Sequence, residues 1–253
     1  MKNIKTFYEQ HLNFAGRTMI EYFISPGIKC KFDMIKNVLD KKRFHNALDL
    51  GCSGNSILHF LDHIHRKFFY DIAARPLLQY TALDEGESIC GDLTRLPFRD
   101  NFFDFITALD VLEHIKQDKR AVSEISRTIQ ENGIVVITVP HLKKYYTAQD
   151  RLIGHYRRYG IPELTELFSS KGFEIVSIFG VYGQLMKFAD LQVTKPQKIE
   201  ESIENLRRKY INSSLFRRLW DIIVQIGAWF MRYDALHQPV DKIMNVALIF
   251  RKK

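Results

Sequence analysis

ALDLGCSGNS, residues 47–56, decides the fold of this chain. Its first half is a short apolar run that ends at Gly51 and predicts a buried strand. Its second half consists of small residues, which let the backbone of a turn approach a ligand closely. A helix after such a turn can direct free N–H groups at a carboxylate. The stretch therefore predicts a strand, a ligand-binding turn and a helix in succession.

Strands and helices alternate outward from this stretch over residues 46–180. Further apolar runs predict strands at 67–70, 88–90, 103–109, 134–139, 173–180 and 246–250. Helices are expected over 57–65, 73–82, 118–129 and 162–171. The strand runs lack strict alternation, as in a parallel sheet covered on both faces. The predicted fold class is α/β: a doubly wound, seven-stranded, mostly parallel sheet.

The same pattern divides the chain into four segments. We expect an N-terminal helical cap (1–45), a core (46–180), a helical insertion (181–242) and the last core strand (243–253). Ser25-Pro26-Gly27 should split the cap into two helical pieces.

Charge is concentrated in two segments. The 253 residues contain 37 Lys and Arg against 29 Asp and Glu, a net charge of +8. Residues 141–160 and 195–218 each carry a net +4, so the remainder balances to zero. This distribution indicates an anionic substrate or an anionic membrane face, or simply two solvated basic segments.

Cysteine usage and the N-terminus bear on the compartment. The three cysteines, Cys30, Cys52 and Cys90, form no CxxC pair, so neither a zinc site nor a disulfide framework is expected. The first residues lack the continuous apolar stretch of a signal peptide. We expect a cytoplasmic protein, with peripheral membrane contact as a further possibility.

Four acids fall at or just after predicted strand ends, where ligands of doubly wound folds bind. These acids are Asp49, Asp71, Asp92 and Asp110. Asp71 follows Asp49 by 22 residues, which suits a carboxylate that accepts hydrogen bonds from ribose hydroxyls. Asp92 is placed to accept a hydrogen bond from an adenine amino group. Each acid alone is equally typical of a helix cap or a turn.

These segments together resemble a known family. ALDLGCSGNS, FFYDIA (68–73), ICGDLTRLPFRDNFFDFITALDVLEHI (89–115) and NGIVVITVP (132–140) are similar to class I S-adenosylmethionine-dependent methyltransferases of the type 11-like group. The resemblance covers about residues 46–180. It implies a Rossmann-like fold, with the strand near 246–251 as the family's last strand.

The resemblance also implies roles for individual residues. The cofactor S-adenosyl-L-methionine would be bound by Asp49, Gly51, Ser53, Asp71, Asp92, Leu93 and Asp110. Asp49 and Gly51 match the motif that contacts the methionine part, and Asp71 matches the acid that holds the ribose. Asp92, with Leu93 beside it, matches the adenine site. Asp110 matches the position next to both methionine and substrate.

The first motif departs from the family pattern Asp-x-Gly-x-Gly-x-Gly. Ser53 stands at the second glycine and Asn55 at the third. Serine is small and asparagine tolerates positive φ, so the turn can survive, and Gly54 can take over a glycine role. The departure leaves open a non-catalytic binding or scaffold protein that kept the fold.

Other nucleotide-binding classes fit less well. The GxGxxG of dinucleotide-binding dehydrogenases and the GxxxxGK[ST] of P-loop proteins are both absent. The net positive charge favours an RNA methyltransferase weakly. No Asn/Asp-Pro-Pro-Tyr base-flipping motif follows the fourth strand, so nucleic acid is an unlikely partner.

Methyl transfer to oxygen usually needs a base that removes the acceptor proton. His114, His141 and His155 are the candidates, because neutral imidazoles suit this task. Asp110, Glu113 and His114 resemble the acid-x-x-Glu-His segment of quinone O-methyltransferases, some of which use magnesium. The Glu-His pair is also common in relatives without metal, so we expect no metal.

Gly154–Tyr159 is a basic, aromatic segment that predicts a substrate site. Arg157 and Arg158 offer forked donors to a carboxylate or phosphate, and Tyr156 can stack on a ring or sugar. By resemblance, the segment occurs in methyltransferase-like proteins of glycan and cell-surface polymer pathways. The alternative is an exposed connector before the helix at Pro162.

The insertion contains a charged part, Lys195–Lys209, and an apolar part, Leu215–Met231. We expect the charged part to be a helix or lid. The apolar part is interpreted as a cover over the active site, a partner or dimer surface, or a membrane-surface segment with Arg217 and Arg218 at headgroups. It is too short and too charged to span a membrane. The sequence thus favours methyl transfer, at oxygen, to a small or amphiphilic acceptor, lipid- or glycan-linked and anionic.

Overall fold

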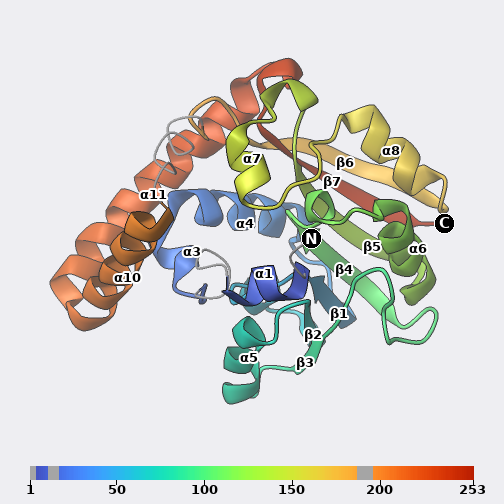
Figure 1. Ribbon diagram of the computed structural model, residues 1–253, viewed down its shortest axis with the longest axis horizontal. Coiled ribbons are helices and arrows are strands. Elements are labelled where there is room, and N and C mark those ends of the chain that lie inside the picture. The colour runs from blue at the N-terminus through green and yellow to red at the C-terminus, as the bar shows by residue number, and fades with distance from the viewer. Residues whose placement is uncertain (1–3, 11–16, 187–195) are drawn as a thin grey trace.

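The computed structural model describes residues 4–10, 17–186 and 196–253, and seven strands form its central sheet (Figure 1). They are β1 (Phe44–Leu50), β2 (Ile64–Asp71), β3 (Glu87–Cys90), β4 (Phe103–Leu109), β5 (Ile129–Pro140), β6 (Phe173–Tyr182) and β7 (Asn245–Lys252). The order is β3-β2-β1-β4-β5-β7-β6. β7 is antiparallel to both neighbours and the other pairings are parallel. The predicted fold class is therefore confirmed.

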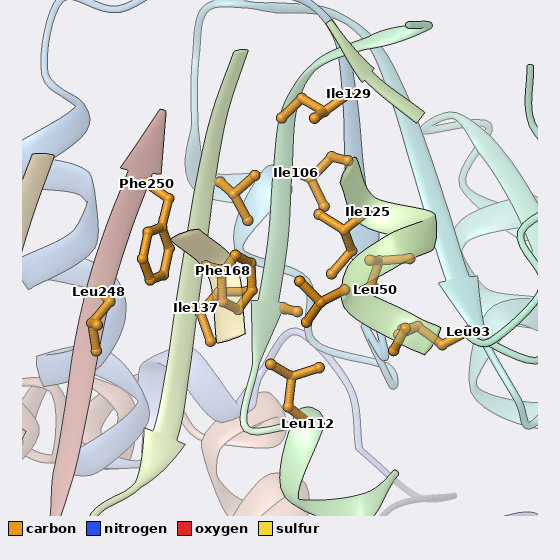
Figure 2. Close-up of a cluster of buried hydrophobic side chains, with 14 of the residues drawn as sticks. Leu50, Leu93, Ile106, Leu112, Ile125, Ile129, Ile137, Phe168, Leu248 and Phe250 are labelled. Atoms are coloured by element: carbon orange, nitrogen blue, oxygen red, sulfur yellow. The ribbon is translucent and has the colours of Figure 1, made fainter. Parts of the chain in front are cut away.

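Helices cover both faces of this sheet. One face packs against α4 (Pro26–Leu39) and α5 (Leu78–Ala82), with Phe32 and Tyr80 in its apolar core. The other packs against α6 (Asp118–Thr128) and α8 (Ile161–Ser169). Figure 2 shows this second core, in which Ile125 and Phe168 meet side chains of the central strands.

Parallel pairing brings the carboxyl ends of four strands to one edge. Leu50 at the end of β1 pairs with Tyr70 of β2 and Ala108 of β4. Asp71 at the end of β2 pairs with Cys90 of β3. The segments that follow these strands therefore lie side by side, as predicted for a ligand-binding edge.

Two expected helices are shorter than predicted. The helix over 57–65 is wrong: a 3₁₀ helix, η1, covers Ile57–Phe60, and Ile64 already pairs with Phe44 of β1. The apolar run that suggested a helix thus contains the start of β2. The helix over 73–82 divides into the 3₁₀ helix η2 (Arg75–Leu77) and α5, and Pro76 lies in the first of these.

The N-terminal cap is helical where it is described, with α1 (Ile4–Gln10), α3 (Glu21–Ile24) and α4. Ser25 separates α3 from α4 as predicted, because its hydroxyl caps α4 by accepting a hydrogen bond from the Ile28 amide. Predicted helical positions Leu12 and Phe14 lie outside the described residues.

The insertion contributes two helices, α10 (Pro196–Asn212) and α11 (Ser214–His237). α11 packs along α4 and β6, and α10 lies beside α11 and reaches α3 (Figure 1). The short helices α7 (Ala148–Leu152), η3 (Leu112–His114), η4 (Lys143–Tyr145) and η6 (Val240–Lys242) complete the described elements. Within the described ranges, no helix combines the length and apolar character that crossing a bilayer requires.

Candidate active site

A cavity of about 890 Å³ lies over the carboxyl edge of the sheet. Its floor is formed by the turns after β1 to β4, and its walls by α4, α7 and α10. Its volume falls in the range typical of small-molecule sites.

The turn after β1 forms part of the floor and uses two positive-φ residues. Gly51 has a φ of 67°, and a Cβ at this position would come within 2.5 Å of Val111 Cγ2. Ser53 has a φ of 48°, so it adopts the conformation that glycine would favour. Gly54 cannot be replaced either, since its Cβ would lie 1.8 Å from the Arg17 carbonyl oxygen. Gly54 is therefore a position that only glycine fits, as predicted. The turn also accommodates Ser53 with its positive φ.

Asp49 lies beneath this turn and does not line the cavity. Its carboxylate accepts hydrogen bonds from Ser56 Oγ at 2.5 Å and from Thr107 Oγ1 at 2.6 Å. Burial raises the pKa of Asp49 to about 6, against the lowering effect of these two hydroxyls. The carboxylate ties the turn to β4, and its predicted contact with a cofactor stays a prediction.

Asp71 reaches the cavity from the end of β2. Its two oxygens accept hydrogen bonds from the amides of Ser53 and Ala73, each at 2.9 Å. Burial raises the pKa of Asp71, and the backbone amides oppose that rise. Each oxygen keeps a second lone pair, so the carboxylate can still accept from a ligand hydroxyl.

Asp92 and Leu93 border the same cavity after β3. Asp92 is exposed and accepts from the amide and hydroxyl of Thr94, both at 2.8 Å. Leu93 is buried and supplies an apolar wall beside that carboxylate. Both predicted positions therefore face the cavity.

Asp110 follows β4 with a φ of 56°, which is unusual for a residue other than glycine. One oxygen accepts from Asn245 Nδ2 at 2.7 Å and Thr138 Oγ1 at 3.0 Å, and the other lies 2.5 Å from Lys31 Nζ. Burial disfavours the charged form of Asp110, but Lys31 outweighs it and lowers the pKa to about 2. Both members of this ion pair line the cavity.

Two of the three predicted bases, His155 and His114, line the cavity, and a carboxylate orients His155. Its Nδ1 lies 2.8 Å from Asp150 Oδ1, and its Nε2 lies 3.8 Å from Glu113 Oε1. Asp150 also accepts from Arg158 Nε at 2.9 Å and Nη2 at 3.0 Å. Burial opposes ionisation of Asp150, but the hydrogen bonds from His155 and Arg158 hold its pKa well below the usual range.

Glu113 and His114 complete this side of the cavity. Glu113 is fully buried without a hydrogen-bond partner for either oxygen among the described residues, and burial raises its pKa far above the usual range. His114 Nδ1 lies 2.6 Å from the Tyr8 hydroxyl, and burial lowers the pKa of His114 to about 3.

Ligand atoms of Glu113, His114 and His155 all lie within 4.8 Å of one another. This set could hold a metal ion, and it differs from the trio considered in the sequence, because Asp110 is bound to Lys31 instead.

Besides Asp49, three further predicted site residues do not line the cavity. His141 is buried, with Nδ1 held 2.9 Å from the Tyr159 carbonyl oxygen. Arg157 pairs with Asp118 at 2.5 Å. Tyr156 is 47% exposed to solvent. Of the predicted substrate residues, Arg158 alone reaches the cavity.

The N-terminal cap and the insertion close the cavity through residues that the sequence did not indicate. Arg207 of α10 forms a buried ion pair with Glu21 of α3, with Nε 2.7 Å from Oε1. Tyr8 of α1 also borders the cavity. The sequence offered one signal: Lys31 lies four residues before buried Ile35 on α4, so a cation occupies the buried face of an amphipathic helix.

The strand order, together with the acids that follow β2, β3 and β4 around one cavity, is the arrangement expected from the sequence resemblance to class I S-adenosylmethionine-dependent methyltransferases. Residues 48–137 match the family described as "Methyltransferase domain". This match, together with the relatives and the solved structure below, supports the resemblance to class I S-adenosylmethionine-dependent methyltransferases seen in the sequence.

Individual relatives were also found. An uncharacterized protein of Methanocaldococcus jannaschii is 27% identical over 72% of this chain and 80% of its own length. A "Probable S-adenosylmethionine-dependent methyltransferase" of Mycolicibacterium smegmatis is 30% identical over 36% of this chain and 37% of its own.

A solved structure shares the fold. It is an N-methyltransferase from Bradyrhizobium japonicum in complex with S-adenosyl-L-homocysteine, with a TM-score of 0.61, 12% identity and 97% coverage of both chains.

Proposed function

We propose that this enzyme transfers a methyl group from S-adenosyl-L-methionine to a hydroxyl oxygen of a small or amphiphilic acceptor, with His155 as the general base. The observation that carries the proposal is the Asp150–His155 pair, which opens onto the cavity beside the strand-end acids.

The donor set fits the cofactor. Asp71 would accept from the ribose hydroxyls, and Asp92 with Leu93 would hold the adenine. The ion pair of Asp110 and Lys31 presents one negative and one positive group to the zwitterionic amino-acid end.

The bound cofactor supplies a methyl group already activated on a sulfonium. The protein's own residues then have to align the acceptor and take its proton. Asp150 stays ionised at neutral pH and accepts from Nδ1–H of His155, which leaves Nε2 as the proton acceptor. His155 and Asp150 thus match the arrangement of other enzymes in which a carboxylate orients the catalytic base.

The cavity walls support an amphiphilic, anionic acceptor. Apolar side chains of α3 and α10 meet there, among them Ile24, Ile203 and Leu206. Lys116 and Arg17 border the same cavity and suit an anionic group such as a lipid- or glycan-linked phosphate. The acceptor's apolar part would lie against α10.

The cluster of Glu113, His114 and His155 favours one variation of this mechanism. A divalent cation held there would orient the acceptor oxygen and lower the pKa of its hydroxyl. Chelation followed by titration of Mg²⁺ distinguishes the mechanism with a metal ion from the mechanism without one. Transfer that survives chelation supports His155 as the base without metal.

Transfer of tritiated methyl groups tests the function. Hydroxylated amphiphiles, with and without a lipid tail, and a bulk RNA sample serve as acceptors. We expect labelled amphiphile and about 10²-fold or greater loss of transfer in His155→Gln, with binding of S-adenosyl-L-homocysteine retained. His141→Gln is the matched control, since His141 lies outside the cavity.

Two other results would overturn the proposal. Labelled RNA without labelled amphiphile would establish an RNA methyltransferase. A chain that binds neither form of the cofactor in calorimetry would be a scaffold.

A further inference from the structure

One face of α11 leaves nine apolar side chains more than half exposed. We call this face the α11 stripe: Leu215, Leu219, Ile222, Ile223, Ile226, Trp229, Phe230, Tyr233 and Leu236. Their spacing of three and four residues places them along one side of the helix. Monomeric proteins rarely expose an apolar patch of this extent without a binding role.

The stripe is not the face that holds α11 to the protein. Val224, Ala228 and Ala235 are buried on the opposite side, where α11 packs against α4 and β6. The fold is therefore complete without any partner on the stripe.

The exposed charges along one edge of the stripe are basic. Arg218 and Arg232 are exposed and lie seven residues either side of Gln225, along one edge of the stripe. The two acids of α11 point elsewhere: Asp221 accepts from the Tyr210 hydroxyl, and Asp234 from the Leu185 amide. A basic edge along an apolar face with Trp and Phe is typical of helices that lie in a membrane interface.

We propose that the α11 stripe docks this enzyme in the plane of an anionic membrane surface. Charge complementarity favours this occupant over a second copy of the chain. Antiparallel pairing of two stripes about Gln225 would place Arg218 of one copy opposite Arg232 of the other. Anionic headgroups would instead neutralise both arginines.

Docking at a membrane would also let the acceptor enter the cavity from the lipid, an inference that rests on the proposed function. Ile203 and Leu206 of α10 line the cavity, and α10 packs against α11. A membrane-bound α11 therefore holds the wall of the cavity next to the lipid phase, from which an amphiphilic acceptor can enter.

Tryptophan fluorescence tests the docking without turnover. The chain has two tryptophans, so Trp220→Phe leaves Trp229 on the stripe as the sole reporter. The probes are vesicles of phosphatidylcholine alone and of phosphatidylcholine mixed with phosphatidylglycerol. We expect a blue shift and co-sedimentation with the anionic vesicles, both weakened by salt.

Matched variants identify the surface. The combined changes Ile222→Ser, Ile226→Ser and Phe230→Ser should weaken vesicle binding about tenfold or more. Leu78→Ser with Leu83→Ser, an exposed apolar pair at the two ends of α5, should not. Arg218→Gln with Arg232→Gln should remove the preference for anionic vesicles. Binding of S-adenosyl-L-homocysteine by each variant shows that it is folded.

The docking proposal is overturned if Trp229 does not respond to anionic vesicles. It is also overturned if the wild type is a dimer that the serine variant makes monomeric, since the stripe would then bind a second copy. Vesicle binding without methyl transfer to any amphiphile would refute the proposed acceptor and leave the docking surface intact.

Discussion

Lys31 on α4 lies 2.5 Å from Asp110 at the end of β4, and this ion pair joins the N-terminal cap to the floor of the cavity. The two residues are 79 positions apart in the sequence, and the Lys31 side chain is only 11% exposed. The pair explains how Asp110 can keep its charge at a partly buried position with a positive φ.

Removal of the Lys31 charge should destabilise the protein. Lys31→Met leaves Asp110 without its cation, and we expect a loss of about 2–3 kcal/mol, less than for a fully buried pair because Asp110 retains some solvent contact. Urea unfolding at neutral pH measures it. Lys29→Met, which breaks a more exposed pair with Asp33 on the same helix, should cost less than about 1 kcal/mol. Equal losses in the two variants would contradict a special role for Lys31.

The buried carboxylates predict opposite effects of pH in different ranges. The pKa of Asp110 is lowered to about 2, so its contribution to stability is present above about pH 4 and is lost as the pH falls through 2. The pKa of Asp49 is raised to about 6 by burial, so the folded state binds its proton more tightly than the unfolded state. Stability from Asp49 therefore falls as the pH rises from about 4 to 6.

Asp49→Asn isolates that second effect. The amide cannot ionise, so the stability of the variant relative to wild type should rise by about 3 kcal/mol between pH 4 and 7, at about 1.4 kcal/mol for each pKa unit. Unfolding free energies across this pH range are the measurement. Parallel stability curves for the two proteins would show that Asp49 titrates normally.

The sequence predicted the sheet, and the edge at which the carboxyl ends of its parallel strands meet, because both depend on local patterns. Apolar runs that end at Gly51, Asp71 and Asp110 predict the strands. Parallel pairing of these strands then brings their carboxyl ends to one edge of the sheet. The short 3₁₀ helix η1 was predicted as a longer helix over 57–65, because Ile57 and Leu58 fit a buried helix as well as a short 3₁₀ turn.

The contacts between distant segments could not be predicted in this way. Arg157 and Arg158 have the residue types of a substrate site, but Asp118 and Asp150 bind their guanidinium groups. Asp118 lies 39 residues from Arg157, so sequence spacing does not indicate that pair. Asp150 lies eight residues from Arg158, and only the fold shows that the two side chains meet. His141 and His155 likewise look equivalent in the sequence, and only the fold shows that His155 faces the cavity.

Asp71 should dominate cofactor affinity. Asp71→Asn keeps the shape of the side chain but removes the charge that would accept ribose hydroxyls, so binding of S-adenosyl-L-homocysteine should weaken by about 1.5–3 kcal/mol. Calorimetry measures the affinity. Thermal unfolding shows whether the variant, in which the Ser53 amide meets an amide side chain, is still folded. Asp62→Asn, an exposed acid, is the control. Unchanged affinity would mean that the ribose is bound elsewhere.

The ion pair of Glu21 and Arg207 should hold α10 over the cavity. Glu21→Gln leaves the buried Arg207 with Glu204, whose side chain is 63% exposed, so we expect a loss of about 3 kcal/mol and faster hydrogen exchange along 201–212. Adding Arg207→Met should recover part of the stability, because the buried cation that lost its Glu21 partner is gone. Exchange in β4 should stay slow in both variants, since the sheet core does not depend on this pair. If exchange along 201–212 matches wild type in Glu21→Gln, apolar contacts of Ile203 and Leu206 hold α10 in place without the ion pair.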